Sequence, residues 1–286
     1  MNAHAYILLL LLLATIALAS VIALYYDPTW VIVMASSGIA FGALSIIVYS
    51  RRLMYMAAAS PHSAFLAAAV SIPLSIKLGL PMDLWMLVIG LTLVYLVGWL
   101  TYRGMDPDEA TSLFVGLSAS GGVLASYYVL TRYPYSSKIW AVVFGDPLLS
   151  TRREVLFSLA VAGLFVIFSF TCIREIVYIG ADVEDARLSG LKVWLYDLAL
   201  FTSIGLVVIV MIRTVGFILE HVLILIPGLI AHYSSKGVYR ALSLSILIAL
   251  FSSIAGLALS IGLDQSPSAM TGLLLVIEFM IVYFAR

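Results

Sequence analysis

Histidine and carboxylate side chains stand inside long apolar stretches of this sequence, where ionisable groups are costly and mark function by default. His62 lies in the middle of the apolar segment 54–77. An imidazole in that position can bind a transition metal such as zinc, manganese or iron, or it can hydrogen-bond to a neighbouring helix. A single histidine in such a segment leaves both interpretations open.

Glu220 and His221 form a second ionisable pair inside an apolar segment. Successive residues of a helix point about 100° apart, so the two side chains do not lie on one line, although either can face the same site as His62. We expect His62, Glu220 and His221 to supply metal ligands. Because Arg213 precedes Glu220 by seven residues on nearly the same helix face, an Arg213–Glu220 ion pair is the alternative. Glu278, in the last apolar segment, is expected to pair with another helix.

The composition indicates that lipid, rather than water, surrounds the protein that holds these groups. Of the 286 residues, 63% are hydrophobic and 10% are charged, and the mean hydropathy is +1.14; soluble domains carry about 25% charged residues. The net charge of +0 gives no electrostatic reason for a nucleic-acid partner. The single cysteine, Cys172, excludes an internal disulfide and a cysteine-rich metal site. The sequence therefore predicts a multi-pass protein of the cell membrane.

The elements that position the ionisable groups are predicted to be membrane-spanning helices, each of which takes about 20 apolar residues. The apolar runs are continuous rather than alternating, which argues against a β-barrel. We predict an all-α, polytopic transmembrane helical bundle of about nine or ten spans, forming one domain over residues 1–286. The first segment lacks the basic start of a signal peptide and is too long for one, so we expect it to be retained. The ten segments are 5–24, 30–49, 54–77, 82–101, 112–130, 154–173, 195–212, 216–232, 239–262 and 269–285.

The basic residues give a weak orientation. With both ends of the chain inside, nine of the 15 basic residues fall on the cytoplasmic side and six fall outside. Arg152 and Arg153 are among the six, directly after a stretch, 138–151, that can dip into the membrane. The bias favours cytoplasmic termini.

One polar connector carries the signals of a short, capped helix at about 182–191. Asp182 can accept a hydrogen bond from an orphan backbone N–H, as an N-cap does. Glu184 and Asp185 fall in the first turn, where the helix dipole favours acids, and Arg187 follows them. Gly190 can adopt the left-handed conformation that ends a helix. This helix is either a solvated connector or a docking knob for a cytoplasmic partner.

Five short motifs, each weak alone, occur in an order and spacing that make a specific signal. Over about residues 30–286 the chain resembles the permease subunits of metal-ion ABC importers, the zinc/manganese/iron family. The motifs are Arg51-Arg52-Leu53-Met54-Tyr55 followed by His62, then Phe144-Gly145-Asp146-Pro147-Leu148-Leu149, the acid-rich start at Asp182 through Gly190-Leu191, Val215-Gly216-Phe217-Ile218-Leu219 with the run ending at Pro227, and Leu263-Asp264-Gln265-Ser266-Pro267-Ser268.

The resemblance implies the permease subunit of an ATP-driven importer, in which a divalent metal is the cargo and no cofactor is permanently bound. It implies a homodimer that works by alternating access, a separate P-loop ATPase in the cytoplasm and a substrate-binding protein outside, with no enzymatic activity in the chain itself. In the family the segment 182–191 is the coupling helix seated on the ATPase. His62 matches the family's metal-pathway histidine, and Asp264 joins the candidate pathway through its motif.

Departures from the family pattern keep other functions open. Ala58 stands where the family has an aspartate, Ala57 replaces the preceding glycine, and Pro61 is inserted before His62. Hard metals such as manganese prefer carboxylate oxygen, so the missing acid leaves the cargo open. The alternatives are an ABC permease for a different small substrate and an ion channel or proton-coupled carrier; a membrane enzyme ranks third. The sequence contains no P-loop, zinc-protease or serine-hydrolase motif.

Overall fold

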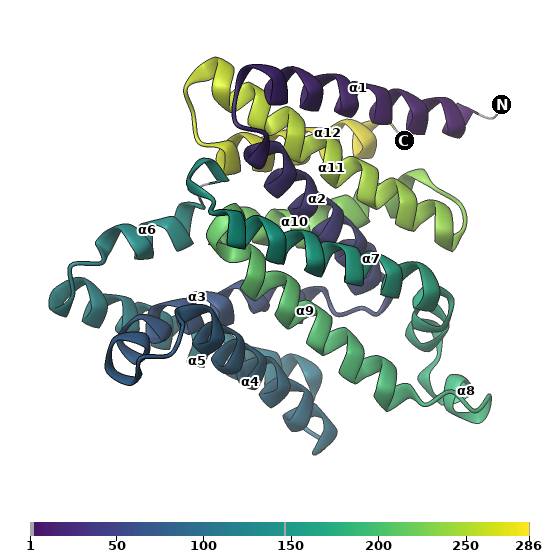
Figure 1. The fold of residues 1–286 in the computed structure, drawn as a ribbon. Coiled ribbons are helices and arrows are strands. Elements are labelled where there is room, and N and C mark those ends of the chain that lie inside the picture. Colours follow the sequence, from purple (N-terminus) through teal and green to yellow (C-terminus); the bar gives the residue numbers. More distant parts are fainter. Residues whose placement is uncertain (1–2, 146, 286) are drawn as a thin grey trace.

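The computed structural model describes residues 3–145 and 147–285, and the side chains of residues 3–7, 136 and 149 lie outside this description. Within these ranges the chain is helical and contains no strand (Figure 1). The elements are α1 (Ala3–Tyr25), α2 (Pro28–Ser50), α3 (Met54–Leu78), α4 (Met82–Tyr102), α5 (Pro107–Arg132), α6 (Ser136–Phe144), the 3-10 turn η1 (Pro147–Leu149), α7 (Arg152–Ala181), α8 (Val183–Leu188), α9 (Val193–Val215), α10 (Phe217–Ser234), α11 (Val238–Leu263) and α12 (Pro267–Phe284).

Ten of the described helices are long and apolar enough to span a membrane, which confirms the predicted helical bundle. Two helices extend furthest beyond their predicted bounds. α5 begins at Pro107 rather than 112, because Asp106 caps it and proline suits the first helical position. α7 continues to Ala181 rather than 173, because buried residues such as Ile176 and Ile179 carry its apolar face onward. The stretch 138–151 holds most of α6, the turn η1 and Thr151, the N-cap of α7.

Local capping signals set several helix starts. Asp27 caps α2 by accepting a hydrogen bond from the Thr29 amide, which lowers the pKa of the Asp27 carboxyl. Thr151 and Glu154 form a reciprocal capping box at the start of α7. Ser266 caps α12 directly before Pro267. These polar capping residues mark where the helices begin, because the apolar helix sequences themselves carry no such signal.

The helices form two groups (Figure 1). In one, α3 packs against α4 and α5. In the other, α2, α10, α11 and α12 pack together and α1 lies along α11. The two groups are joined by α9, which contacts α3 and α4 as well as α7, and by a contact between α3 and α10. The α3–α10 contact is therefore a seam between two bodies.

Small residues let the second group pack closely. A Cβ added at Gly38 or Gly42 of α2 would lie 2.7–2.9 Å from backbone atoms of α11. A Cβ added at Gly228 of α10 would lie 2.6 Å from the carbonyl group of Ser45 on α2. In lipid such close approach replaces the hydrophobic drive for helix association. The α2–α10–α11 core is thus packed to backbone contact.

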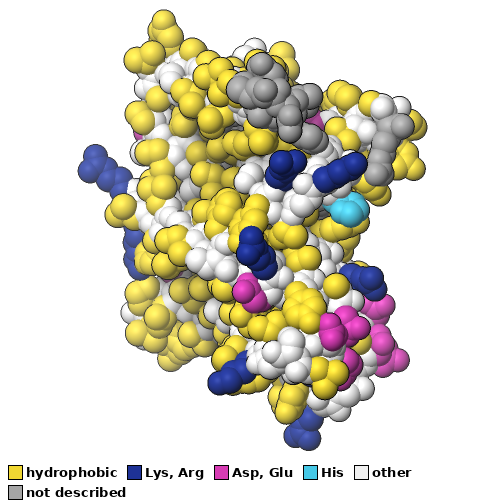
Figure 2. Space-filling view, turned by 90° about the vertical axis from the view of Figure 1, so that its right-hand side faces the viewer, with side chains coloured by type: hydrophobic (Ala, Val, Ile, Leu, Met, Phe, Trp, Pro, Cys, Tyr) yellow, Lys and Arg dark blue, Asp and Glu magenta, His cyan; other side chains and the backbone are white. Residues whose placement is uncertain are grey.

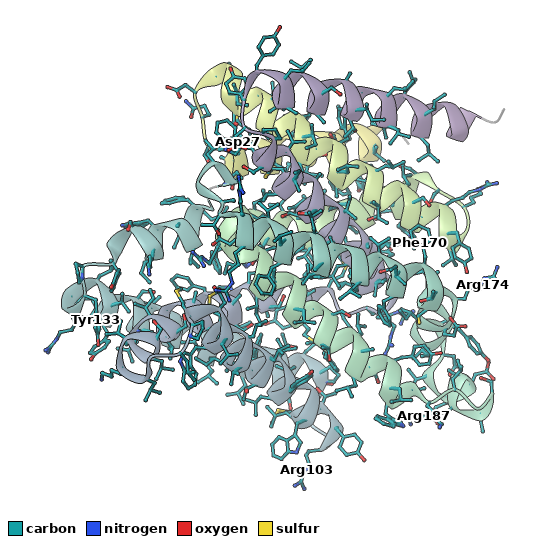
Figure 3. The ribbon with its side chains drawn as sticks, viewed as in Figure 1. Asp27, Arg103, Tyr133, Phe170, Arg174 and Arg187 are labelled. Carbon is teal, nitrogen blue, oxygen red and sulfur yellow. The ribbon has the colours of Figure 1, made fainter. Side chains whose placement is uncertain are left out.

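Both ends of the described chain lie at the same end of the molecule as α8 (Figure 1). Arg174 and Arg187 also lie at this end, whereas Asp27 and Tyr133 lie toward the opposite end (Figure 3). This arrangement agrees with the predicted topology, in which the two termini and the 182–191 helix share one side of the membrane. We call this the inner end and the opposite end the outer end.

Candidate functional site

Two of the predicted ligands meet at the seam. His62 of α3 and His221 of α10 have ring centroids 5.3 Å apart and ring planes inclined by 81°. Phe217, one turn before His221, closes the group with its ring centroid 4.9 Å from His62 and 4.6 Å from His221. Both histidines are half-buried. Helices more than 150 residues apart in the sequence thus bring two imidazoles together.

A hydrogen bond fixes which nitrogen of His221 is free. Nδ1 of His221 lies 2.7 Å from the carbonyl oxygen of Phe217. A carbonyl can only accept, so Nδ1 carries the proton and donates. In a neutral imidazole Nε2 then keeps its lone pair. This is the orientation that metal-binding histidines take from their outer partners.

A crossing of two loops sets where α10 begins. Gly145, after α6, and Gly216, before α10, both have positive φ, +68° and +85°. A Cβ on either glycine would collide with the backbone of the other loop, at Val215 or Phe144. Only glycine combines this conformation with so close an approach. The crossing ties α6, which also contacts α3, to the start of α10, where Phe217 lies one turn before His221.

A less buried stripe leads from the histidine pair toward the inner end. On α3 it consists of His62, Ala58 and Tyr55, spaced by three or four residues. On α10 the corresponding stripe is His221, Leu225, Leu229 and His232. Residues between these positions are mostly buried, so both stripes follow one face of their helix.

The stripes end at a cavity of about 720 Å³ at the inner end. Tyr55 and His232 both line it, together with Tyr49, Arg52 and Ser235. The rings of Tyr49 and His232 lie 4.5 Å apart. Figure 2 views this end of the molecule, where acidic side chains gather in one corner and basic ones are spread more widely. The cavity gives the seam an opening on the side of α8.

Glu220 and Asp264 do not join the pair. The described residues contain no group of three or more His, Cys, Asp or Glu side chains able to hold a metal, so the expected trio is not assembled. Glu220 is fully buried, and its carboxylate oxygens have no hydrogen-bond partner. Glu220 directly precedes His221, and because adjacent helix residues diverge by about 100°, its side chain does not follow the line of His221. Asp264 is exposed and ends α11 with a φ of +53°.

The alternative Arg213–Glu220 ion pair is wrong. Arg213 instead bridges two acids, with nitrogen–oxygen distances of 3.2 Å to Asp83 of α4 and 2.8 Å to Glu154 of α7. Arg213 lies in the last turn of α9, and the chain breaks helical geometry at Gly216, so the seven-residue helical spacing does not continue into α10. Sequence analysis missed this outer network, although an arginine at the end of an apolar segment is the signal for it.

The 182–191 segment has the predicted caps. Asp182 accepts from the Asp185 amide at 3.0 Å, and Glu184 lies in the first turn, 3.0 Å from Arg187. Gly190 has a φ of +88°, and the amide of Gly190 and that of the next residue donate to the carbonyls of residues 187 and 186. This double bond pattern is a Schellman ending. The helix itself is shorter than predicted, Val183–Leu188.

Buried ionic contacts also occur near the inner end. Arg51, only 9% exposed, lies 2.6 Å from Asp197 of α9. This bond joins the end of α2 to α9, close to α8. Glu278 of α12 pairs with another helix as expected, since the Ser252 hydroxyl of α11 lies 2.7 Å from its carboxylate.

Known proteins resemble this chain over most of its length. The family described as "ABC 3 transport family" matches residues 25–286. The "Probable metal transport system membrane protein" of Thermotoga maritima is 24% identical over 241 residues, which are 84% of this chain and 82% of that protein. The "Manganese transport system membrane protein MntB" of Synechocystis sp. is 20% identical over 249 residues, 87% of this chain and 79% of that protein.

A solved structure shares the fold. A chain in the structure of "PsaBC from Streptococcus pneumoniae in complex with Fab" superposes with a TM-score of 0.80 at 18% identity, over 94% of this chain and 95% of that one. At this identity the match concerns the fold alone.

Proposed function

The chain belongs to the ABC 3 transport family, and from this premise we propose that it is the permease subunit of an ATP-driven importer that carries a divalent metal ion. The observation that carries the proposal is the histidine pair His62–His221 at the seam between two helix groups. The names of the metal and manganese transport relatives support the same class of cargo.

The chemistry of the pair suits transient metal binding. Nε2 of His221 offers a lone pair, and the ring of His62 lies next to it. Imidazole nitrogen suits zinc and iron, whereas manganese prefers oxygen ligands. Two nitrogen ligands without an acid bind more weakly than a closed site, since Ala58 stands where a carboxylate would add charge. Weak binding is what a transport path requires, because the ion must leave again.

We infer that the path runs along the seam from the histidine pair to the inner cavity. The two less buried stripes on α3 and α10 supply its walls, and Tyr55 and His232 stand where it opens. Alternating access then consists of small movements of the α3–α5 group against the α2–α10–α11–α12 group. The seam is the place where such movement breaks the fewest close contacts.

A second copy of the chain completes the path in this proposal. Ionisable side chains at membrane depth face protein or water rather than lipid. His62 and His221 are only half-buried within one chain, so their open side must be covered. A two-fold partner presents the same face, as isologous dimers do. The assembled importer is therefore a homodimer with an extracytoplasmic binding protein at its outer end.

The cytoplasmic ATPase docks on α8. This helix projects from the inner end between α7 and α9, and Leu188 at its tip is 87% exposed. Its two caps make it rigid, and Tyr178 donates a 2.7 Å hydrogen bond to Asp185, which ties it to α7. A rigid knob joined to two spanning helices can transmit movement of the ATPase. The sequence has no P-loop, so ATP hydrolysis belongs to the partner.

Co-purification with the ATPase tests this assignment. Gly190→Val forces a β-branched residue to positive φ and should abolish the Schellman ending, which costs roughly 1–2 kcal/mol. Arg187→Glu removes the Arg187–Glu184 pair and reverses a charge on the knob. With either variant, less than a third of the ATPase that co-purifies with the wild-type chain should be recovered. Gly163→Val on α7, where an added Cβ meets nothing within 4 Å, is the matched control.

Transport itself is measured with the assembled complex. The chain alone should hydrolyse no ATP, and the chain with its ATPase in vesicles should accumulate manganese, iron or zinc when ATP is supplied. ATP hydrolysis by the isolated chain, or a complex that hydrolyses ATP but accumulates none of these metals, would refute the proposed function.

A further inference from the structure

The cavity at the inner end combines a polar rim with an apolar wall. It lies between the inner ends of α2, α3, α7, α10 and α11 and has a volume of about 720 Å³. Arg52, His232 and Ser235 line it at the helix ends, and we call these three residues the rim. Ile46 of α2 and Ile173 of α7 line it one to two turns further into the membrane-spanning segments. A ligand that complements this cavity is polar at the rim and apolar below it.

Positive charge gathers around the rim. Arg52 belongs to it, and Lys236 stands in the loop between α10 and α11, whose two other residues both line the cavity. Arg174 of α7, at the inner end in Figure 3, precedes the lining residue Ala181 by seven positions and lies on nearly the same helix face. Among the described residues, no ion pair involves Arg52, Lys236 or Arg174. The only charged-group contact of Arg174 is with the ring of Tyr239, 5.0 Å from its centroid.

The acids of this end belong to other parts of the molecule. None of the described residues that line the cavity is acidic, and α5, α8 and α9 contribute no residue to its lining. Glu175 of α7 is two residues from both Ile173 and Val177, so it points about 160° away from that face of the helix. The acids on the three elements outside the lining are Asp106, Asp108, Glu109, Asp182, Glu184, Asp185 and Asp197. The positive charge of the rim is therefore uncompensated within the described chain.

The backbone at Arg52 directs two adjacent arginines to different places. Arg52 has a φ of +56°, a left-handed conformation that is uncommon outside glycine. Arg51 is 9% exposed and lies 2.6 Å from Asp197 of α9, whereas Arg52 is exposed and lines the cavity. One guanidinium thus fastens α2 to α9, and the other is left for a ligand.

We propose that the inner cavity binds an anionic phospholipid from the adjacent leaflet, with the phosphate at Arg52 and part of an acyl chain against Ile46, Ile173 and Val177. A guanidinium binds phosphate oxygens through paired, charge-assisted hydrogen bonds. Basic pockets between membrane helices are typical binding sites for anionic headgroups. The binding does not rest on the proposed function. In that function, the phosphate also offsets the positive rim that a metal cation meets on leaving.

The apolar wall favours a lipid over a free phosphate ion. A free ion would satisfy Arg52 but leave the wall of Ile46, Ile173 and Val177 uncovered, at the depth where acyl chains lie. Tyr49 and Tyr55 also line the cavity, and tyrosine is enriched at the level of lipid headgroups. The arrangement of charge, aromatic rings and apolar side chains along the cavity follows that of a phospholipid.

The experiment uses the purified full-length chain in detergent, stripped of lipid and without metal. It is titrated with phosphatidylglycerol or phosphatidylcholine, and native mass spectrometry counts the bound lipids and the copies of the chain. We expect one phosphatidylglycerol per chain, bound several-fold more tightly than phosphatidylcholine, and a Tm that rises with it. Arg52→Gln, at an exposed position, should weaken phosphatidylglycerol binding about fivefold or more, as the loss of one basic group at the headgroup predicts. Val177→Phe, which narrows the apolar part, should weaken the binding of both lipids.

Two controls separate this site from general attraction to the membrane surface. Lys192→Gln removes the same charge from the α8–α9 connection, outside the cavity, and should bind phosphatidylglycerol like the wild type. Inorganic phosphate in place of chloride, at constant ionic strength, should not raise the Tm. The double variant His62→Ala/His221→Ala should keep lipid binding while losing metal uptake, so this proposal and the proposed function fail independently.

Three results would overturn the proposal. Equal affinity for the two lipids, or equal losses in Arg52→Gln and Lys192→Gln, would show that no headgroup site exists in the cavity. A Tm rise with inorganic phosphate as large as with phosphatidylglycerol would assign the rim to a free anion. A change in the number of associated chains on Val177→Phe, without a change in lipid binding, would assign the cavity to a second copy of the chain.

Discussion

The two sides of α10 differ in packing as much as in chemistry. Toward α3, His221 is half-buried and meets His62 and Phe217 through ring contacts across the seam. Toward α2, α11 and α12, Glu220 and Gly228 are fully buried, and the helices approach to backbone contact. One helix therefore carries an adaptable face and a fixed face. In the proposed function, an ion at the seam can bind and leave without disturbing the core that holds α10 in place.

The largest effect on metal uptake is expected from replacing both histidines of the seam. The double substitution His62→Ala/His221→Ala removes both nitrogen ligands and should lower metal uptake at least tenfold. Stability should change little, because alanine suits both helices and the loss of half-buried polar groups relieves their desolvation cost. Uptake is measured by elemental analysis of metal-starved cells, normalised to the amount of inserted protein.

A glutamine substitution at His62 decides whether this side chain binds metal or only bridges two helices. If His62 only hydrogen-bonds a neighbouring helix, His62→Gln should transport at the wild-type rate, since an amide keeps that bond. We expect it to be nearly as inactive as His62→Ala, because an amide is a poor ligand for transition metals. Full transport by either His62→Gln or His62→Ala would show that His62 does not bind the transported metal.

The opposite pattern is expected on the fixed face. Gly228→Ala adds a methyl group 2.6 Å from the Ser45 carbonyl and must push α10 from α2, an overpacking cost of about 1–3 kcal/mol. The Tm should fall while the uptake of correctly folded protein is preserved. Gly262→Ala on α11, where nothing lies within 4 Å, is the control and should stabilise slightly through helix propensity. Equal Tm values for the two variants would show that the close packing of this face contributes nothing.

The difference between local signals and contacts of distant helices explains what sequence analysis could and could not predict. The spans were predictable because lipid demands continuous apolar helices, and the α8 caps were predictable because capping depends on neighbours in sequence. The grouping of His62 with His221 rested only on both being ionisable residues in apolar segments, since residues from distant helices carry no local signal of their meeting. The surroundings of Glu220 could not be predicted, because a helix position alone does not tell which neighbouring helix the residue faces.

A smaller effect is expected from adding an acid to the seam. Ala58 lies one turn before His62 on the same stripe, so Ala58→Asp places a carboxylate beside the imidazole pair. An oxygen ligand with a negative charge should lower the KM for manganese uptake several-fold and affect zinc less. Uptake kinetics for both metals, compared with Ala58→Asn as a neutral control, give the answer. An unchanged KM in a well-expressed Ala58→Asp protein would place the stripe outside the ion path.

The smallest effect is expected at Asp264, which its motif assigns to the pathway. The structure puts this residue at the exposed outer end of α11, where its φ of +53° ends the helix and its amide donates to the Ser260 carbonyl. Asparagine tolerates the same left-handed conformation, so Asp264→Asn removes the charge and keeps the turn. Uptake should change less than twofold when metal is supplied directly to vesicles. A larger loss in that assay would make Asp264 a metal ligand at the outer end of the path. The histidine pair at the seam would then be the second binding site that the ion meets.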